Sequence, residues 1–428
     1  MKILVVGSGG REHAICATLQ RTSRTPLQLF CAPGNAGIAQ TAACIPIKVD
    51  DSRALRSYAE TEAIDLTIVG PEGPLAAGLV DLFAERGLKI VGPCETAAQL
   101  EASKAFAKAF MNRHSIPTAS YRVATSFDEA EAILSSGEFG GEETGVVIKA
   151  DGLAAGKGVF VAIDRREALA GLNELRSGVA GTEAVRKIVI EERLSGPEVS
   201  VLLFSDGKNY HLMPVARDHK RIGENDTGPN TGGMGTIADN SLIDPITLDQ
   251  VIHEIVEPTL QGCRDEGFPF RGILFIGLML TPVGPRVLEY NVRFGDPETQ
   301  SILVRLKTDM TQICEAITEG RLGEIDVEWS AGSSACVVLA AKGYPGKAET
   351  GAEIQGLERA AQHQNVSVFH AATKHSNGVW LTAGGRVLGV TATGANLKLA
   401  LARCYGAVRE VQWDGMQYRR DIGRTAPG

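Results

Sequence analysis

Short apolar strands alternate with Gly- or Pro-containing turns and helices throughout the first hundred residues. Strands that alternate with helices in this way form a parallel sheet, because each crossover helix packs back onto the sheet it leaves. We therefore expect a doubly wound α/β domain with a parallel sheet over residues 1–103, with a helical stretch from Glu95 to Arg113 leading out of it. Its predicted strands are Ile3 to Val6, Leu27 to Cys31, Leu66 to Val69 and Lys89 to Val91.

The rest of the chain is predicted to form two more domains. A chain of 428 residues is too long for a single core and fits about two to four domains. Residues 104–325 alternate strands such as Val199 to Phe204 with helices such as Leu248 to Glu266, and we expect a strand-rich smaller lobe at about 120–192. After a charged, Gly-containing stretch, apolar alternation returns and predicts a small mixed α/β domain at 326–428.

Composition narrows the class of protein. The net charge of -8 argues against a general nucleic-acid or anionic-membrane surface, because both of those partners are negatively charged. The longest uncharged apolar run, Gly272 to Leu280, is about half of the roughly 20 residues that a membrane helix needs, so it predicts a buried strand. Eight cysteines without a C-x-x-C pair, and no secretion signal, favour reduced thiols and a cytoplasmic protein.

The turn Gly7 to Glu12 follows a strand and opens a helix. Its backbone N–H groups and the helix dipole can hold a phosphate, although a bare strand-to-helix turn would have the same sequence. The dinucleotide fingerprint G-x-G-x-x-G requires a third glycine where Glu12 stands, and no acid near Phe30 is placed to receive a ribose. An NAD-dependent enzyme is therefore disfavoured.

A second glycine-rich segment runs from Lys149 to Gly158. Its three glycines and two lysines between strands suit a flap that closes over a polyphosphate, whereas an ordinary hairpin turn is the alternative. It is no P-loop, because the spacing from Gly152 to Gly156 is one residue short and Gly158 replaces the hydroxyl residue.

Polar and apolar residues alternate from Val287 to Arg293. The period of two puts Glu289, Asn291 and Arg293 on one face of a strand. A carboxylate and an amide oxygen are hard ligands that suit Mg²⁺, and Arg293 can meet negative charge. A solvated polar face is the alternative. The opposite face, expected in the core, carries Leu288, Tyr290 and Val292.

Two more segments are candidates for ligand binding. Ile188 to Glu192 ends in acids and Glu198 follows, which predicts either solvated strand ends or a hinge whose backbone pairs with adenine while a carboxylate accepts ribose hydroxyls. The stretch from Asp218 to Gly235 is a long loop with many backbone donors and few apolar anchors. Glycine-rich loops of this length inside a domain are often functional.

Taken together, long motifs resemble the phosphoribosylamine–glycine ligase family of the ATP-grasp superfamily nearly from end to end. The motifs are GSGGREHA at Gly7, APGNAG at Ala32, DLTIVGPE at Asp65, QLEASKAF at Gln99, IKADGLAAGKGV at Ile148, DHKRIGENDTGPNTGGMG at Asp218, NVRFGDPETQ at Asn291 and GGRVLGVTA at Gly384. The resemblance implies a pre-ATP-grasp domain for phosphoribosylamine, a two-lobed ATP-grasp core and a small carboxyl-terminal domain.

The resemblance also implies a reaction. ATP, glycine and 5-phosphoribosylamine give ADP, phosphate and glycinamide ribonucleotide, the second step of purine synthesis, with ATP and Mg²⁺ or Mn²⁺ as cofactors. Glycine's carboxylate would first become glycyl phosphate, and the amine would then displace phosphate while water is excluded.

Residue roles follow from the same motif matches. Glu289 and Asn291 match the metal ligands, and Arg293, Lys149 and Asp218 are expected at the reacting groups. The expected ATP contacts are Lys104, Lys149, Gly152, Gly156, Lys157, Gly158, Glu191, Leu194 and Glu198. The expected substrate contacts are Asp218, Thr227, Gly228, Pro229, Asn230 and Arg293 for glycine and its acyl phosphate, and Gly9, Gly10, Arg11, Asn35 and Glu72 for the amine.

Two other readings stay open at this point. A biotin-type or purine carboxylase of the same superfamily would couple bicarbonate, and a regulatory nucleotide-binding protein would keep the fold without catalysis. The TGPNTGGMG loop argues against the first, and the joint presence of Lys149, Glu289, Asn291 and Arg293 argues against the second. We expect a monomer that binds small molecules, with transient contact to the enzyme that supplies phosphoribosylamine.

Overall fold

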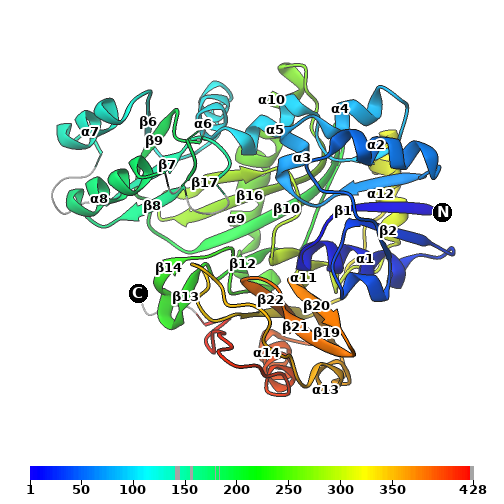
Figure 1. Ribbon diagram of the computed structural model, residues 1–428. Coiled ribbons are helices and arrows are strands. Elements are labelled where there is room, and N and C mark those ends of the chain that lie inside the picture. Colours follow the sequence, from blue (N-terminus) through cyan, green and yellow to red (C-terminus); the bar gives the residue numbers. More distant parts are fainter. Residues whose placement is uncertain (140–144, 155–157, 179, 183, 425–428) are drawn as a thin grey trace.

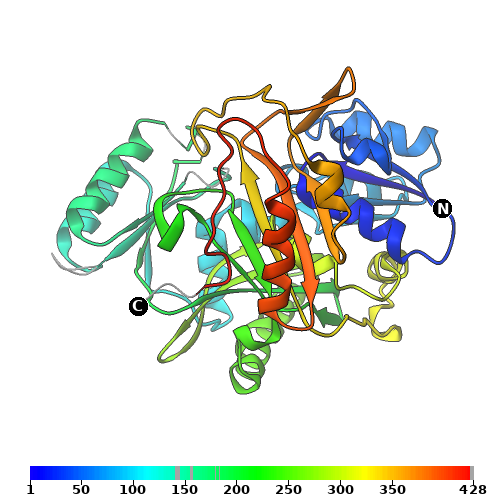
Figure 2. The same ribbon diagram turned by 90° about the horizontal axis from the view of Figure 1, so that it is seen from below.

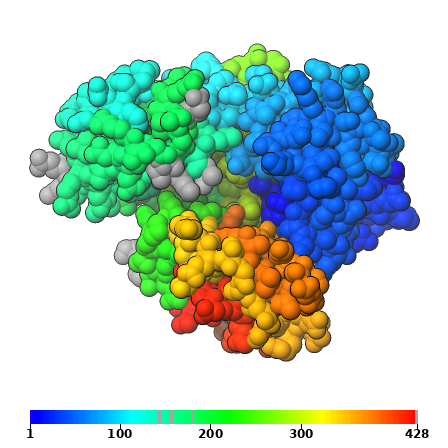
Figure 3. Space-filling view, viewed as in Figure 1, coloured from blue at the N-terminus to red at the C-terminus, as the bar shows by residue number. Residues whose placement is uncertain are grey.

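The computed structural model describes residues 1–139, 145–154, 158–178, 180–182 and 184–424. An amino-terminal region, a small lobe and a large sheet that extends into the carboxyl-terminal region surround a central hollow (Figure 1, Figure 3). Among the described residues, no helix is long and apolar enough to cross a membrane.

The amino-terminal region is the predicted doubly wound sheet. Its elements are β1 (Lys2–Gly7), α1 (Gly10–Thr22), β2 (Gln28–Pro33), η1 (Ile38–Gln40), β3 (Ala43–Cys44), α2 (Ser52–Thr61), β4 (Leu66–Val69), α3 (Glu72–Ala76), α4 (Leu79–Ala84) and β5 (Ile90–Val91). The strands are all parallel, in the order β3-β2-β1-β4-β5. Ile3 and Val5 join one hydrophobic cluster while Leu4 and Val6 join another, so both faces of the sheet are buried.

The helical stretch predicted from Glu95 to Arg113 is two helices, α5 (Glu95–Ala102) and α6 (Lys104–Arg113). Ser103 separates them in an extended conformation, and its hydroxyl accepts a hydrogen bond from Phe106 N, which caps α6. The same hydroxyl donates to Asp151, which ties this break to the small lobe. A capping serine that is also fixed by another segment explains why the helix is interrupted here.

The small lobe stands apart on the left of Figure 1 and has its own hydrophobic core. Its elements are β6 (Tyr121–Ala124), α7 (Phe127–Ser136), β7 (Val146–Ala150), β8 (Val159–Ala162), α8 (Arg165–Arg176) and β9 (Ile188–Glu192). The four antiparallel strands run in the order β6-β9-β7-β8. Ser126 and Asp164 cap the two helices through their side chains.

A large, mostly antiparallel sheet forms the middle of the molecule. Its strands are β10 (Glu198–Asp206), β11 (Tyr210–Leu212), β12 (Ala216–Asp218), β15 (Gly235–Ala238), β16 (Arg271–Thr281), β17 (Gly284–Asn291), β18 (Ser333–Ala340), β19 (Val366–His370) and β22 (Arg386–Gly394). The order is β17-β16-β10-β12-β15-β18-β22-β19, with β11 beside β10. Because β15 pairs with β18, the strands of the carboxyl-terminal region continue the central sheet.

Helices and short hairpins complete the two halves of this sheet. They are β13 (Arg221–Gly223), η2 (Glu224–Asp226), β14 (Thr227–Asn230), η3 (Asn240–Leu242), α9 (Pro245–Val251), a π-helical segment (Ile252–Val256), α10 (Glu257–Asp265), α11 (Glu298–Leu303), α12 (Met310–Glu319), η5 (Leu322–Glu324), α13 (Leu357–Ala361), β20 (Thr373–Ser376), β21 (Val379–Thr382) and α14 (Leu397–Val408). Figure 2 shows α14 lying across β18 and β22, where its apolar side chains bury the outer face of the sheet.

Candidate active site

The carboxyl end of β17 carries the polar residues that the alternation predicted. A bulge interrupts the pairing with β16, because Gly277 pairs with Glu289 while Leu278 pairs with Val287. The prediction that Leu288 lies in the core is therefore wrong. Val287 is buried instead, and Leu288 lines a narrow cavity. A bulge shifts every earlier side chain by one position, and the sequence pattern does not reveal it.

Glu289 is surrounded by cations. Burial acts to raise the pKa of its carboxyl group, but Lys220, Lys149 and Lys104 outweigh this, so the pKa is lower than usual. Glu289 therefore stays a carboxylate. Asn291 follows on the same face and its Oδ1 accepts a hydrogen bond of 3.0 Å from Arg293 Nη2. A carboxylate and an amide oxygen beside each other fit a Mg²⁺ ion.

Arg293 is held by two carboxylates from the amino-terminal region. Its guanidinium lies 2.9 Å from Glu101 Oε1 and 3.3 Å from Glu72 Oε2. Burial raises the pKa of Glu101 to about 6, although Arg293 acts in the opposite direction. Glu101 also accepts a hydrogen bond of 2.7 Å from Val292 N. The sequence reasoning missed Glu101, whose only signal was its place inside the QLEASKAF motif.

Glu191, on β9 of the small lobe, joins Lys149 of β7 to Lys108 of α6. Its carboxylate oxygens lie 3.0 Å from Lys108 Nζ and 3.0 Å from Lys149 Nζ, and all three side chains are buried. Lys149 Nζ also donates to Leu288 O at 2.9 Å, so it faces the end of β17. Burial lowers the pKa of Lys108 to about 8. Of the other predicted hinge residues, Leu194 is half-buried and Glu198 is exposed.

The glycine-rich segment after β7 is fastened to the start of α6. Lys104 Nζ donates to Gly152 O at 3.3 Å, and burial lowers the pKa of Lys104. Asp151 accepts from Ala105 N at 2.7 Å. Gly158 is buried and its carbonyl accepts from Ala150 N. Two further predicted ATP contacts lie outside the described residues, namely Gly156 and Lys157.

The stretch from Asp218 to Gly235, which we call the glycine loop, begins at the narrow cavity, which Asp218 and Lys220 line together with Leu288. Burial raises the pKa of Asp218, and the neighbouring carboxylate of Glu298 adds to the effect. The buried Oδ1 of Asp218 has no hydrogen-bond partner among the described residues. Lys220 lies 3.1 Å from Glu198. The predicted substrate residues of β14 are exposed or half-buried, namely Thr227, Gly228, Pro229 and Asn230.

We call the turn from Gly7 to Glu12 the phosphate turn. The carboxylate of Glu12 binds two other residues of this turn. Glu12 accepts a hydrogen bond of 2.6 Å from Gly9 N and pairs with Arg11 Nε at 2.7 Å. Arg11 is buried and also donates to Phe294 O, next to Arg293. A Cβ placed on Gly70 would lie 1.9 Å from Glu12 Oε1, so glycine leaves the room that Glu12 fills.

Two residues predicted beside the amine substrate hold other segments. Asn35 donates to Ser8 O at 2.7 Å and to His370 O at 2.9 Å, so it links the phosphate turn to the carboxyl-terminal region. Glu72 begins α3 and pairs with Arg293. Gly10 is buried beside Gln300. The structure thus brings the residues predicted to bind the amine and the end of β17 into one neighbourhood.

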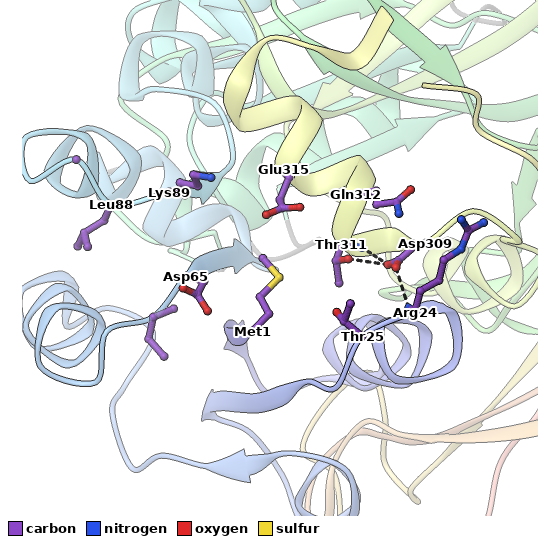
Figure 4. A pocket seen from close by; sticks show the side chains of 12 residues that line it. Met1, Arg24, Thr25, Asp65, Leu88, Lys89, Asp309, Thr311, Gln312 and Glu315 are labelled. Atoms are coloured by element: carbon purple, nitrogen blue, oxygen red, sulfur yellow. Dashed lines mark hydrogen bonds between the residues drawn. The ribbon is translucent and has the colours of Figure 1, made fainter. Parts of the chain in front are cut away.

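Another cavity, of about 590 Å³, lies at the opposite edge of the amino-terminal sheet (Figure 4). Met1, Asp65 and Lys89 line it and precede β1, β4 and β5. Two of its charged side chains have partners within the protein: Lys89 pairs with Glu319, and Asp309 accepts from Arg24 N. It contains none of the predicted site residues.

Comparison with known proteins agrees with this architecture. Three family models match: phosphoribosylglycinamide synthetase N domain over 1–101, its ATP-grasp (A) domain over 102–299 and its C domain over 334–425. The phosphoribosylamine–glycine ligase of Caldanaerobacter subterraneus subsp. tengcongensis is 44% identical over 422 residues, which cover 99% of both chains.

Solved structures give the same answer. A crystal structure of phosphoribosylamine–glycine ligase from Thermotoga maritima has a TM-score of 0.84 and 33% identity, and covers 99% of this chain and all of its own. A biotin carboxylase domain from Hydrogenobacter thermophilus, solved with MgADP and bicarbonate, has a TM-score of 0.71 over 97% of this chain and 91% of its own. At 16% identity the second likeness shows the fold alone. This chain belongs to the phosphoribosylamine–glycine ligase family of ATP-grasp enzymes.

Proposed function

We propose that the chain ligates glycine to 5-phosphoribosylamine, with ATP cleaved to ADP and phosphate, through a glycyl phosphate intermediate. The observation that carries the proposal is the meeting of Lys149, Glu289 and Arg293 at the end of β17, next to the phosphate turn. A carboxylate is a poor electrophile, so it needs activation, and this neighbourhood supplies cations where the transferred phosphoryl group gains charge.

ATP would lie between the small lobe and the large sheet. Lys149 and Lys104 face Glu289 from the small-lobe side, and their ammonium groups suit the phosphates. The backbone from Glu191 to Leu194 would pair with adenine, and Glu198 would accept the ribose hydroxyls. Gly152 and Gly158 flank the segment that would close over the phosphates, together with Gly156 and Lys157.

Glu289 and Asn291 would hold the metal ion. The low pKa of Glu289 keeps it ionised, and an oxygen-only donor pair suits Mg²⁺ or Mn²⁺. The ion would supply neutralisation of phosphate charge. Arg293 lies beside this pair and would stabilise the transferring phosphoryl group.

In the first step, a glycine carboxylate oxygen bonds to the γ-phosphorus and the bond to the ADP oxygen breaks. We place glycine between Asp218 and the rest of the glycine loop, where the Asp218 oxygen that has no hydrogen-bond partner among the described residues would accept from its ammonium group. Thr227, Gly228, Pro229 and Asn230 would cover it. Thr227, Gly228 and Pro229 are exposed and Asn230 is half-buried, so this strand is accessible to a small ligand.

In the second step, the amine nitrogen attacks the acyl carbon, the bond to the phosphate oxygen breaks, and the nitrogen loses a proton. Gly9, Gly10 and Arg11 would hold the phosphate of phosphoribosylamine, and Asn35 and Glu72 would lie near its ribose. Because Gly9 N–H already binds Glu12, a phosphate would have to compete for that donor or use its neighbours.

Several broader proposals go with this function. We propose three domains at 1–103, 104–325 and 326–428, with a nucleotide lobe at about 120–192. We also propose a cytoplasmic monomer that meets the enzyme supplying its unstable amine only transiently.

The test is ADP release by the purified protein with ATP, Mg²⁺, glycine and freshly generated phosphoribosylamine, with each component omitted in turn. Release that requires both glycine and the amine supports the proposal. Release driven by bicarbonate would instead identify a carboxylase, and ATP binding without turnover in any mixture would identify a regulatory protein.

A further inference from the structure

We propose that Arg386, at the start of β22, is a positioning residue that fastens the glycine loop to Asp296 and the phosphate turn, and so aligns the acyl phosphate with the incoming amine. The inference rests on the proposed function and deepens it. It gives the carboxyl-terminal region, and its GGRVLGVTA motif, a part in the reaction.

The guanidinium of Arg386 contacts two segments that are far apart in sequence. Nη2 lies 3.0 Å from Asp296 Oδ2, and Nη1 donates to Asp296 O at 2.9 Å. Nη1 also donates to Gly232 O in the glycine loop. The side chain is 22% exposed, and its two contacts to Asp296 are partly buried, whereas Gly232 lies at the surface. One side chain thus spans the glycine loop and the segment after β17.

The loop side of this contact depends on glycine and on a tyrosine. A Cβ on Gly232 would lie 3.0 Å from Arg386 Cζ, so a side chain there would press on the guanidinium. Tyr344, from the same region as Arg386, accepts a hydrogen bond of 2.9 Å from Gly232 N through its hydroxyl. Both polar groups of the Gly232 backbone are therefore bound by the carboxyl-terminal region.

The other side of the contact reaches the phosphate turn. Asp296 Oδ1 accepts from Gln300 Nε2 at 2.9 Å. A Cβ on Gly9 would lie 3.6 Å from Asp296 Oδ2, and one on Gly10 would lie 2.8 Å from Gln300 Nε2. A continuous chain of contacts therefore runs from the glycine loop through Arg386, Asp296 and Gln300 to the turn. Burial acts to raise the pKa of Asp296, but Arg386 and Arg11 outweigh this and keep it ionised.

Misalignment at this junction has a specific chemical consequence. An acyl phosphate that does not meet the amine is attacked by water at its acyl carbon, and the bond to the phosphate oxygen breaks. Glycine and phosphate are then released, and ADP has formed without an amide. Loss of Arg386 should therefore raise the ratio of ADP to amide product, whereas a general loss of fold lowers both together.

The experiment compares the full-length protein with Arg386→Lys, Tyr344→Phe and Arg403→Lys. Arg403 is the matched control, because it is an arginine of the same region whose guanidinium binds a single backbone carbonyl, Thr393 O. For Arg386→Lys we expect KM for glycine and for the amine to rise about tenfold or more, with an ADP-to-amide ratio above that of the parent. KM for ATP should stay within about twofold, since the ATP lysines are untouched.

Tyr344→Phe distinguishes the effect at the glycine loop from the effect at the phosphate turn. It removes only the acceptor for Gly232 N, so KM for glycine should rise a few-fold while KM for the amine stays unchanged. Arg403→Lys is expected to keep the parent's ADP-to-amide ratio and its KM values for glycine and for the amine. If the parent ligates but Arg386→Lys also keeps that ratio and both of those KM values, the inference is overturned. If the parent itself does not release ADP with glycine and amine, the proposed function has failed instead.

Discussion

The carboxyl end of β17 and the phosphate turn touch each other where Arg11 donates to Phe294 O, yet they present polar groups differently. At β17, Glu289 and Arg293 are side chains already set among opposite charges. At the turn, the backbone donor of Gly9 is occupied by Glu12. The charged side chains of β17 would therefore meet a charged ligand directly, whereas a ligand at the turn would have to displace Glu12 from Gly9 N.

The difference predicts how the end of β17 and the phosphate turn should respond to mutation. Side chains around Glu289 act on charge directly, so single changes there should reduce turnover strongly. Side chains around the turn act by holding backbone in place, so changes there should alter stability and the KM of one substrate more than turnover.

The largest effect is expected from Glu289 and Asn291, the proposed metal ligands. Glu289→Gln removes a carboxylate that four neighbouring cations keep ionised. Ligation should fall roughly 10²- to 10³-fold, by analogy with the loss of one electrostatic group at a transition state. Adding Asn291→Ala should remove most of the ligation activity that Glu289→Gln retains. Initial rates of ADP release over a Mg²⁺ titration measure this, and the single variant should need more Mg²⁺ than the parent.

Glu358→Gln is the control, since Glu358 is an exposed carboxylate on α13 with no place in the proposed site. It should leave the Mg²⁺ dependence unchanged. Intact ligation by the double variant would show that Glu289 and Asn291 do not hold the metal.

The second effect tests how Arg293 is held. Glu101→Gln weakens the ion pair of 2.9 Å to Arg293, which in turn binds Asn291, so kcat should fall about 10- to 100-fold, as for other outer partners of metal ligands. The pKa of Glu101 is raised to about 6 in the folded protein, so its carboxylate form is lost below that pH. Activity of the parent should therefore fall as pH decreases through about 6.

Glu101→Gln should lack this acidic limb, because an amide does not titrate. Glu95→Gln, an exposed acid on the same helix α5, should keep the parent's profile. An acidic limb that persists unchanged in Glu101→Gln would mean that another group causes it, and that Glu101 does not set the position of Arg293.

The strands and the parallel sheet could be predicted because periodicity and burial follow from local sequence. The shared face of Glu289 and Asn291 could also be predicted, since the two residues lie two positions apart on one strand, whereas their role as metal ligands stays a prediction. Leu288 could not, because the bulge that turns it toward the cavity depends on how β17 pairs with β16. The alternation of residue types is a property of one strand, whereas the pairing register depends on both β16 and β17.

Other site residues were missed for a related reason. Glu101 enters the site through its ion pair with Arg293, and Glu298 through its electrostatic effect on Asp218; both partners lie far away in the chain. Asn35 was predicted beside the ribose but bridges Ser8 and His370. Neither kind of contact leaves a local signature, because tertiary packing decides which polar side chains meet.

The smallest effect is expected at Asn35. It distinguishes two roles for this residue, namely holding the backbone of the phosphate turn in place and binding the substrate directly. Asn35→Ala removes hydrogen bonds to Ser8 O and His370 O, so the free energy of unfolding should fall by about 2 kcal/mol. KM for the amine should rise only a few-fold and KM for ATP should not change. Urea unfolding and initial rates measure these, with Asn112→Ala, an exposed asparagine of α6, as control. A hundredfold rise in KM for the amine with unchanged stability would instead mean that Asn35 turns toward the substrate and binds it directly. The contrast between β17, whose charged side chains act on the ligand, and the phosphate turn, whose side chains hold the backbone in place, would then no longer hold.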